Sequence, residues 1–194
     1  MYRIDLNCDL GEGTGNDAAM MPYISSASIA CGFHAGDADT MFATAGLCAD
    51  AGVNAGAHPS FHDRANFGRT EQPVLPGAVY ELMIQQLLLI DEMTHAAGTV
   101  MRHVKPHGAL YNMAARDMEL ATAIARAVKN FNRELVLFGL SGSKLIEAGK
   151  AEGLVTASEV FGDRTYQDDG SLTPRAQPNA LITDTEVSVA QVLQ

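Results

Sequence analysis

Residues 102–112 place several reactive side chains in one short stretch. They read Arg-His-Val-Lys-Pro-His-Gly-Ala-Leu-Tyr-Asn and so contain an ammonium group, two imidazoles and a phenol. The apolar residues around its start predict a strand, which the proline and glycine that follow bring to an end. Side chains two positions apart on a strand point to the same face, so Lys105 and His107 can contact one small molecule, with His103 deeper on that face. The stretch therefore predicts a substrate-handling site where a strand meets a loop.

The elements that must position this site follow from the apolar patterning. The expected strands are residues 4–8, 27–31, 53–57, 100–104, 135–138, 154–161 and 179–183. The expected helices are residues 40–51, 77–97, 117–130, 141–148 and 184–193. Strands that alternate with helices are typical of parallel βα units, and a closed series of these units forms a barrel. We therefore expect an α/β fold with a single barrel domain over residues 1–194.

The length of the chain limits how this barrel can close. An eight-fold βα barrel normally takes about 250 residues, whereas the chain has 194. It therefore closes with seven strands, stays open or lacks its last unit. The terminal helix with no strand after it favours a barrel that is incomplete at the C-terminus.

Reactive side chains also follow the other predicted strands. They are Asp9, Glu12, His34, Asp37, His58, Lys105, His107, Glu159, Asp163 and Arg164. Because the carboxyl ends of parallel strands meet at one edge of a sheet, we expect these groups to converge on one mouth. The alternative is that each is a hydrogen-bonded polar group or a helix cap.

The residue types leave two chemistries open. Asp9 with His34, His58 or His107 could bind zinc, manganese or nickel, and we predict Asp9, His58 and His107 as the ligand set, although no local His-x-x-x-His or His-x-Asp spacing supports it. Without a metal, His107 and a carboxylate would exchange protons with the substrate while Lys105 offsets negative charge. Arg69 is either a solvated charge or a clamp on a carboxylate or phosphate. Cys31 is more typical of a packed thiol than of a nucleophile.

Composition excludes several classes of protein. The formal charge of −10, from 13 basic and 23 acidic residues, disfavours nucleic acid and anionic membranes as partners. The three cysteines are odd in number and lack Cys-x-x-Cys spacing, which argues against a disulfide framework or a zinc knuckle. Neither a signal peptide nor a membrane-spanning run is expected, so the cytoplasm is the expected location. The glycine signatures of dinucleotide sites, phosphate loops and serine hydrolases are absent.

Several stretches closely resemble the LamB/YcsF family, which supplies the A subunit of bacterial 5-oxoprolinase. They are Asp-Leu-Asn-Cys-Asp-Leu-Gly-Glu at 5–12, Ile-Ala-Cys-Gly-Phe-His-Ala-Gly at 29–36, Gly-Ala-His-Pro at 56–59 with Phe-Gly-Arg at 67–69, and Val-Lys-Pro-His-Gly-Ala-Leu-Tyr-Asn at 104–112. Residues 159–164, Tyr166 and Arg175 match as well. The similarity covers nearly the whole chain.

The resemblance implies an ATP-dependent hydrolase that opens the lactam 5-oxoproline to L-glutamate together with two partner subunits, B and C. The implied fold is an irregular seven-stranded βα barrel, akin to glycoside hydrolases and polysaccharide deacetylases. The family's motif positions fall on Asp9, Glu12, His34, His58, Arg69, Lys105, His107, Glu159 and Arg164. Two departures are His62, where the family pattern has proline, and the family's last strand with its His-Gly-Asp motif, which we expect to be missing. A homo-oligomer stays open.

The implied mechanism assigns roles to these positions. ATP would phosphorylate the amide oxygen, and water would then attack the activated carbon. As a hypothesis, His107 or Asp9 is the base, Lys105 and Arg69 hold phosphate or the substrate carboxylate, and His34 and His58 orient or protonate. Asp9, His58, Lys105 and His107 form the predicted catalytic set. Glu12, His34, Arg69, Glu159 and Arg164 form the predicted binding set.

Two other functions stay open. One is a metal-dependent, deacetylase-like hydrolase of a carbohydrate or amide, with Asp9, His58 and His107 as ligands. The other is a subunit that binds a small molecule without turning it over.

Overall fold

The computed structural model describes residues 4–193, which form six strands and the helices around them. The strands are β1 (Asn7–Leu10), β2 (Ser26–Ala30), β3 (Asn54–His58), β4 (Met101–Val104), β5 (Val136–Leu140) and β6 (Thr156–Glu159). The α-helices are α1 (Asp17–Met20), α2 (Ala38–Ala51), α3 (Pro76–Ala96), α4 (Gly108–Arg116), α5 (Met118–Phe131), α6 (Lys144–Ala151) and α7 (Thr185–Val192). Two 3-10 turns, η1 (Met21–Tyr23) and η2 (Arg64–Asn66), lie in the loops.

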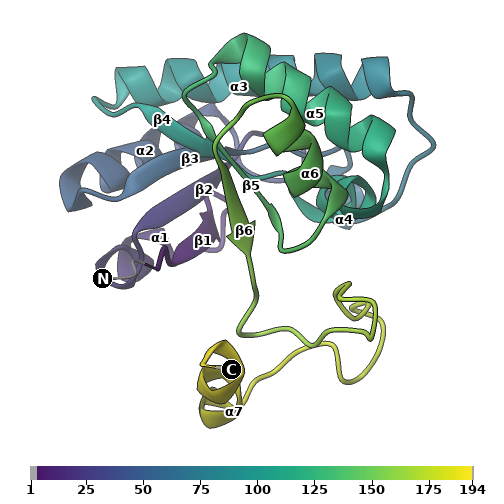
Figure 1. The fold of residues 1–194 in the computed structure, drawn as a ribbon. Coiled ribbons are helices and arrows are strands. Elements are labelled where there is room, and N and C mark those ends of the chain that lie inside the picture. Colours follow the sequence, from purple (N-terminus) through teal and green to yellow (C-terminus); the bar gives the residue numbers. More distant parts are fainter. Residues whose placement is uncertain (1–3, 194) are drawn as a thin grey trace.

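The six strands form one parallel sheet in the order of the sequence, β1 to β6. Figure 1 shows this sheet as an open half-barrel with β1 and β6 at its two edges. The predicted seven-stranded barrel is therefore corrected to six strands in the described residues. The expected strand at 179–183 makes only an isolated antiparallel bridge, between Arg164 and Leu181. A short apolar run becomes a strand only where a neighbouring strand offers a ladder, and none lies beside this one.

The hydrophobic core lies between one face of the sheet and the helices that cover it. In Figure 1, α2, α3, α5 and α6 lie on the same side of the strands. Alternate strand residues point to these helices and are buried and apolar. They include Ala27, Ile29, Ala55, Ala57, Val104 and Leu137. The residues between them point to the concave face, where no helix layer competes for them.

The concave face is lined by small, polar and aromatic side chains. His103 is buried there, stacked on Phe138 with 4.5 Å between ring centroids, and its Nε2 lies 3.1 Å from the Ser28 hydroxyl oxygen. Its ring covers Gly56 so closely that a Cβ on this glycine would lie 2.3 Å from ring atoms. This contact lies between β3 and β4, and His58 ends β3 while Lys105 directly follows β4.

Most predicted helices are confirmed, with adjusted ends. Asp37 caps the start of α2 by accepting from the Thr40 amide, and Gly52 ends that helix in the left-handed conformation. Ser143 caps α6, so that helix begins later than predicted and contains Gly149. The sequence pattern does not predict helix α4. Its first residue is the same glycine that marks the end of the strand segment.

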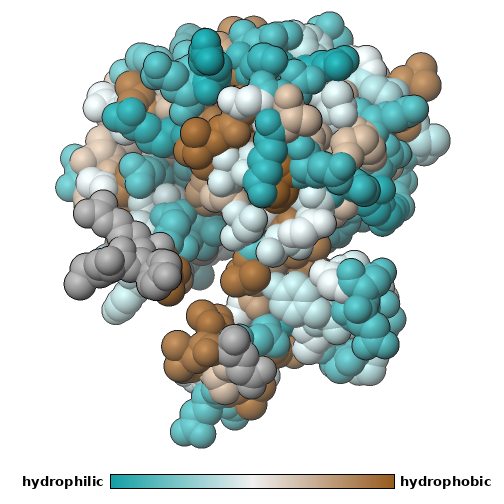
Figure 2. All heavy atoms as spheres, viewed as in Figure 1, coloured by the Kyte–Doolittle hydropathy of each residue, from teal (hydrophilic) through white to brown (hydrophobic). Residues whose placement is uncertain are grey.

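The chain after β6 runs below the sheet and ends in α7 (Figure 1). Asp184 caps α7 by accepting from the amides of Glu186 and Val187. Gln191 ties the helix to the preceding segment by donating to the Phe161 and Arg164 carbonyls. Figure 2 shows apolar side chains gathered on this helix. None of the helices formed by residues 4–193 has the length and apolar character to cross a membrane.

Candidate functional site

A cavity of about 380 Å³ opens at the carboxyl ends of the strands, a size typical of small-molecule sites. Of the nine predicted site positions, eight line it: Asp9, Glu12, His58, Arg69, Lys105, His107, Glu159 and Arg164. The ninth, His34, is buried behind His107, with the two rings stacked at 3.9 Å between centroids. The expected convergence of strand-end groups is therefore present, while the role of each remains a prediction.

Lys105 is the centre of the cavity's charge network. Its ammonium lies 2.6 Å from Asp9 Oδ1 and 2.9 Å from Glu159 Oε1, and it donates to the Asn7 amide oxygen at 2.6 Å. Burial alone would lower the pKa of Lys105, but the two carboxylates outweigh it and raise that pKa. Glu159 also accepts from the Tyr111 hydroxyl at 2.8 Å. Since two carboxylates already neutralise Lys105, it is poorly placed for the predicted role of holding a further anion.

Asp9 is the carboxylate that faces the open part of the cavity. Burial alone would raise the pKa of Asp9, but His58 and Lys105 hold it well below its usual range. Its Oδ2 lies 3.2 Å from His58 Nε2, and the residue is partly exposed. Asp9 is therefore ionised and accessible at neutral pH.

His58 and His107 form an edge-to-face pair behind Asp9, with 4.8 Å between ring centroids. His58 donates from Nδ1 to the Lys105 carbonyl at 2.7 Å, and His107 donates from Nε2 to the Phe67 carbonyl at 2.9 Å. Phe67 presents that carbonyl from a left-handed backbone, with φ of 56°, a conformation that is costly for a residue with a side chain. The remaining nitrogens, His58 Nε2 and His107 Nδ1, face each other at 2.9 Å.

His34 is fixed from the helix layer. Its Nδ1 lies 2.8 Å from the Ser60 hydroxyl oxygen, and that hydroxyl can itself donate to the Phe61 carbonyl. The tautomer of His34 decides whether its ring donates to this hydroxyl or accepts from it. Gln86 on α3 clamps Ser60 with two 2.9 Å bonds, one to its amide and one to its carbonyl. A buried glutamine in the apolar stripe of a helix thus positions an imidazole of the site.

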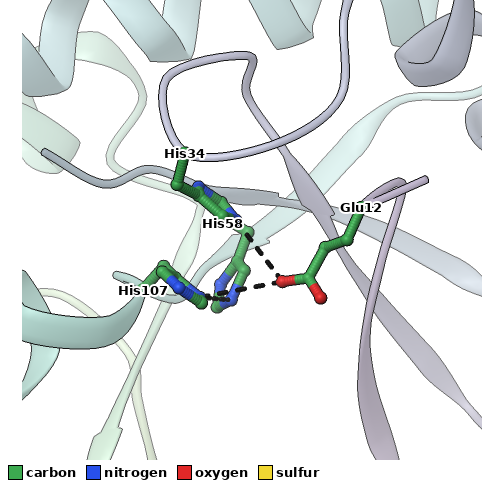
Figure 3. Close-up of side chains that lie close together, drawn as sticks. All are labelled: Glu12, His34, His58 and His107. Atoms are coloured by element: carbon green, nitrogen blue, oxygen red, sulfur yellow. Dashed lines mark hydrogen bonds and ion pairs between the residues drawn. The ribbon is translucent and has the colours of Figure 1, made fainter. Parts of the chain in front are cut away.

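Glu12 completes the group of imidazoles. Its Oε1 lies 3.4 Å from His34 Nε2 and 3.8 Å from His107 Nδ1. Figure 3 shows the carboxylate pointing at the imidazoles from the loop after β1. One donor atom from each of Glu12, His34, His58 and His107 lies within 4.8 Å of the others. This group shares His58 and His107 with the predicted metal set, which stays a prediction, and it adds Glu12 and His34 in place of Asp9.

Burial is the main cause of the pKa shifts of His34 and His107. It lowers the pKa of His34 and, with the neighbouring His58 and His34, lowers the pKa of His107 to about 2. Burial, together with Glu159, raises the pKa of Tyr111 well above its usual range. In the structure as it stands, His34 and His107 are therefore neutral at pH 7.

Three arginines line the other side of the cavity: Arg69, Arg164 and Arg175. Arg164 is buried at 7% exposure and donates to the Thr173 and Ala180 carbonyls. Burial and the charge of Arg175 lower the pKa of both Arg69 and Arg164. Within residues 4–193, none of these three arginines has a carboxylate within 4.0 Å, whereas Arg116 and Arg126 do. The three cavity guanidiniums thus keep their positive charge available for an anion.

Some predicted strand-end groups lie elsewhere. Asp37 is used as the cap of α2, and Asp163 is exposed and does not line the cavity. Cys31 is fully buried, and burial raises the pKa of its thiol to about 12, which confirms the expectation of packing. Asn7 and Arg175 belong to the site but were not in the predicted set. The alternation of Asn7 with Asp9 along β1 was the available signal for the first.

Comparison with protein families matches residues 4–194 to the LamB/YcsF family. Among characterised proteins, the A subunit of 5-oxoprolinase from Brevibacillus brevis is 52% identical over 199 aligned positions, which cover all of this chain and 78% of that protein.

Among solved structures, a lactam utilization protein from Thermus thermophilus superposes with a TM-score of 0.92 at 40% identity, covering 99% of this chain and 80% of that one. The HMG-CoA lyase of Brucella melitensis gives a TM-score of 0.53 at 13% identity, covering all of this chain and 68% of that one, which is a likeness of fold alone. A protein from Enterococcus faecalis assigned to cellobiose-phosphate cleavage is similar at the same level, with a TM-score of 0.56 and 14% identity over 96% of this chain and 72% of that one.

Proposed function

The chain belongs to the LamB/YcsF family, and we propose on that premise that it acts as the A subunit of an ATP-dependent 5-oxoprolinase, with the strand-end cavity as the place where the lactam ring opens. The observation that carries the proposal is the convergence of side chains from separate motifs on one cavity. Identity of 52% to the A subunit of a 5-oxoprolinase over the full chain supports the choice of reaction. The name of that relative implies further subunits, and we propose two, B and C.

Asp9 is the group best placed to handle the attacking water. It is ionised, partly exposed to the cavity and held in position by the Lys105 ammonium at 2.6 Å. His107, the other candidate base, has one nitrogen bonded to a carbonyl and the other directed at His58. We therefore assign Asp9 to orienting the water and accepting its proton, and Lys105 to keeping Asp9 ionised.

The arginine side of the cavity supplies the anion site. The lactam substrate carries a carboxylate, and activation by ATP adds a phosphoryl group at the amide oxygen, which leaves when water attacks the ring carbon. Arg69, Arg164 and Arg175 bring three positive charges without a paired carboxylate to the same cavity. Guanidinium groups suit both anions because they donate in a fork. This role replaces the one predicted for Lys105.

Reconstitution tests the function. The chain is mixed with candidate B and C subunits, ATP and 5-oxoproline, and glutamate release is followed. We expect turnover only with all components, and an Asp9→Asn variant should lose at least about a hundredfold in kcat. An Arg175→Gln variant should raise KM much more than it lowers kcat. Binding of 5-oxoproline without turnover in the complete mixture would point to a non-catalytic binding role instead.

The group of imidazoles favours a second candidate function, a metal-dependent hydrolase of a carbohydrate or amide. Donor atoms of three imidazoles and one carboxylate lie within 4.8 Å of one another, and such ligands suit zinc, nickel or manganese. This function requires amide hydrolysis by the isolated chain with a divalent metal and no ATP. An absolute need for ATP and the partner subunits would exclude it. For either function we propose the cytoplasm as the location.

A further inference from the structure

The three imidazoles of the site share one pattern of hydrogen bonds. Each has one ring nitrogen bonded to a fixed oxygen outside the group. The partners are the Ser60 hydroxyl for His34, the Lys105 carbonyl for His58 and the Phe67 carbonyl for His107. Because a carbonyl only accepts, it sets the tautomer of His58 and of His107. Imidazoles that bind metals are held in this way, because the outer bond orients the ring and leaves the other nitrogen as a lone pair.

The remaining nitrogens point at one another and at a carboxylate. His58 Nε2 and His107 Nδ1 lie 2.9 Å apart, and His34 Nε2 lies 3.4 Å from Glu12 Oε1 (Figure 3). With the bonds to the two carbonyls in place, the facing nitrogens of His58 and His107 are both hydrogen-bond acceptors, and neither has a proton to donate. Acceptors at this distance repel unless a cation lies between them.

A proton or a metal ion would fill this need. One extra proton on His58 would satisfy its contact with His107, at the free-energy cost of placing a charge on a buried ring. A single divalent ion meets all four donor atoms, since these lie within 4.8 Å of one another and metal–ligand bonds of about 2.1 Å bring such atoms to comparable separations.

We propose that Glu12, His34, His58 and His107 bind one divalent metal ion of the zinc, manganese or nickel class through one carboxylate oxygen and three imidazole nitrogens. The proposal deepens the proposed function by naming a cofactor for the same cavity. When bound, such an ion supplies positive charge that polarises a carbonyl or acidifies water. Asp9 lies outside the ligand set, because its Oδ1 contacts the Lys105 ammonium.

Metal content tests the proposal without reference to turnover. The isolated chain is purified without chelator and its metals are measured by mass spectrometry; it is then stripped and titrated calorimetrically with Zn²⁺, Mn²⁺ and Ni²⁺. We expect one ion per chain after titration and a rise in the unfolding temperature of the loaded form. No heat of binding and no rise in unfolding temperature with any of the three ions would overturn the proposal.

Matched variants test the ligand set. Glu12→Gln and His34→Gln should each weaken binding by at least about a hundredfold, more than the loss of an outer partner costs. His95→Gln, at an exposed histidine on α3, should leave affinity within about threefold. Glu12 is partly exposed on a loop, so its variant should fold, and urea unfolding of the stripped proteins checks this.

Asp9→Asn separates the two ligand sets. Under the proposal it lowers metal affinity less than about tenfold, since it removes only a neighbouring charge. A loss as large as that of Glu12→Gln would overturn the ligand set. Metal binding that survives in a chain inactive with 5-oxoproline would support the site while refuting the proposed function, so the two failures are distinguishable.

Discussion

Replacing Gly56 by Ala should destabilise the protein through a single steric contact. The added Cβ would lie 2.3 Å from two atoms of the His103 ring and 2.4 Å from a third. A separation of about 3.5 Å is needed, so the ring must move by about 1.2 Å. It is not free to move, because it is buried, stacked on Phe138 and bonded to Ser28.

The magnitude follows from these restraints. Overpacking in a rigid core costs about 1 to 3 kcal/mol, and breaking the bond to Ser28 leaves buried polar groups unpaired at about 1 to 3 kcal/mol. Gly56→Ala should therefore lower the free energy of unfolding by about 2 to 6 kcal/mol. Activity should fall as well, since a displaced His103 ring disturbs the concave face next to His58 and Lys105.

Urea unfolding followed by circular dichroism measures the effect in a double-mutant cycle with His103→Ala. The cost of Gly56→Ala should fall by about 2 kcal/mol or more in the His103→Ala background, because the ring is then absent. Gly46→Ala is the matched control, since a Cβ there meets nothing within 4 Å in the middle of α2, and it should stabilise by about 0.5 to 1 kcal/mol. An equal cost of Gly56→Ala in both backgrounds would refute the reasoning.

Three further predictions concern charge and burial. Lys105→Met leaves Asp9 and Glu159 without their cation and should lower the free energy of unfolding in urea by about 3 to 5 kcal/mol at pH 8. The loss should be smaller at pH 5, where carboxylates can take up protons. An equal loss at both pH values would contradict this prediction. Burial lowers the pKa of His103 from 6.5 to about 3 in the folded chain. Between pH 6.5 and pH 3 only the unfolded chain therefore binds a proton at this ring. The free energy of unfolding should decrease as the pH is lowered through this range, by up to about 1.4 kcal/mol per pH unit. A His103→Gln variant should show a shallower slope by this amount, and an unchanged slope would exclude His103. Cys31 should resist a thiol reagent in native buffer and react with it in urea, and peptide mapping identifies the labelled cysteine. Labelling of Cys31 in the native chain would disprove its burial.

The site residues at strand ends are easier to predict from the sequence than those that lie outside strands and helices. The rule that parallel strands end at one edge needs only the strand ends, and Asp9, His58 and Lys105 each follow a clear apolar run. Arg175 lies in a segment without a strand or helix, so that rule gives it no place. The tautomers of the imidazoles depend on oxygens distant in sequence, which no local pattern reveals.

The errors in the fold have physical causes of the same kind. Gly108 predicts an end to regular structure, yet its φ of 56° lets the chain turn directly into α4, and a Cβ there would lie 2.6 Å from the Gly68 carbonyl oxygen. Residues 179–183 have the composition of a strand but no partner ladder. Gln86 interrupts the apolar stripe of α3, and only the contact with Ser60 explains its burial.

The Lys105 ammonium also has a mechanical consequence. It contacts Asp9 on β1 and Glu159 on β6, the two border strands of an unclosed arc, from a position just after β4. These two ion pairs connect the edge strands β1 and β6 across the concave face and limit the distance between them. A change in the polar centre therefore alters the curvature of the whole sheet, so in this molecule shape and reactivity cannot be varied separately.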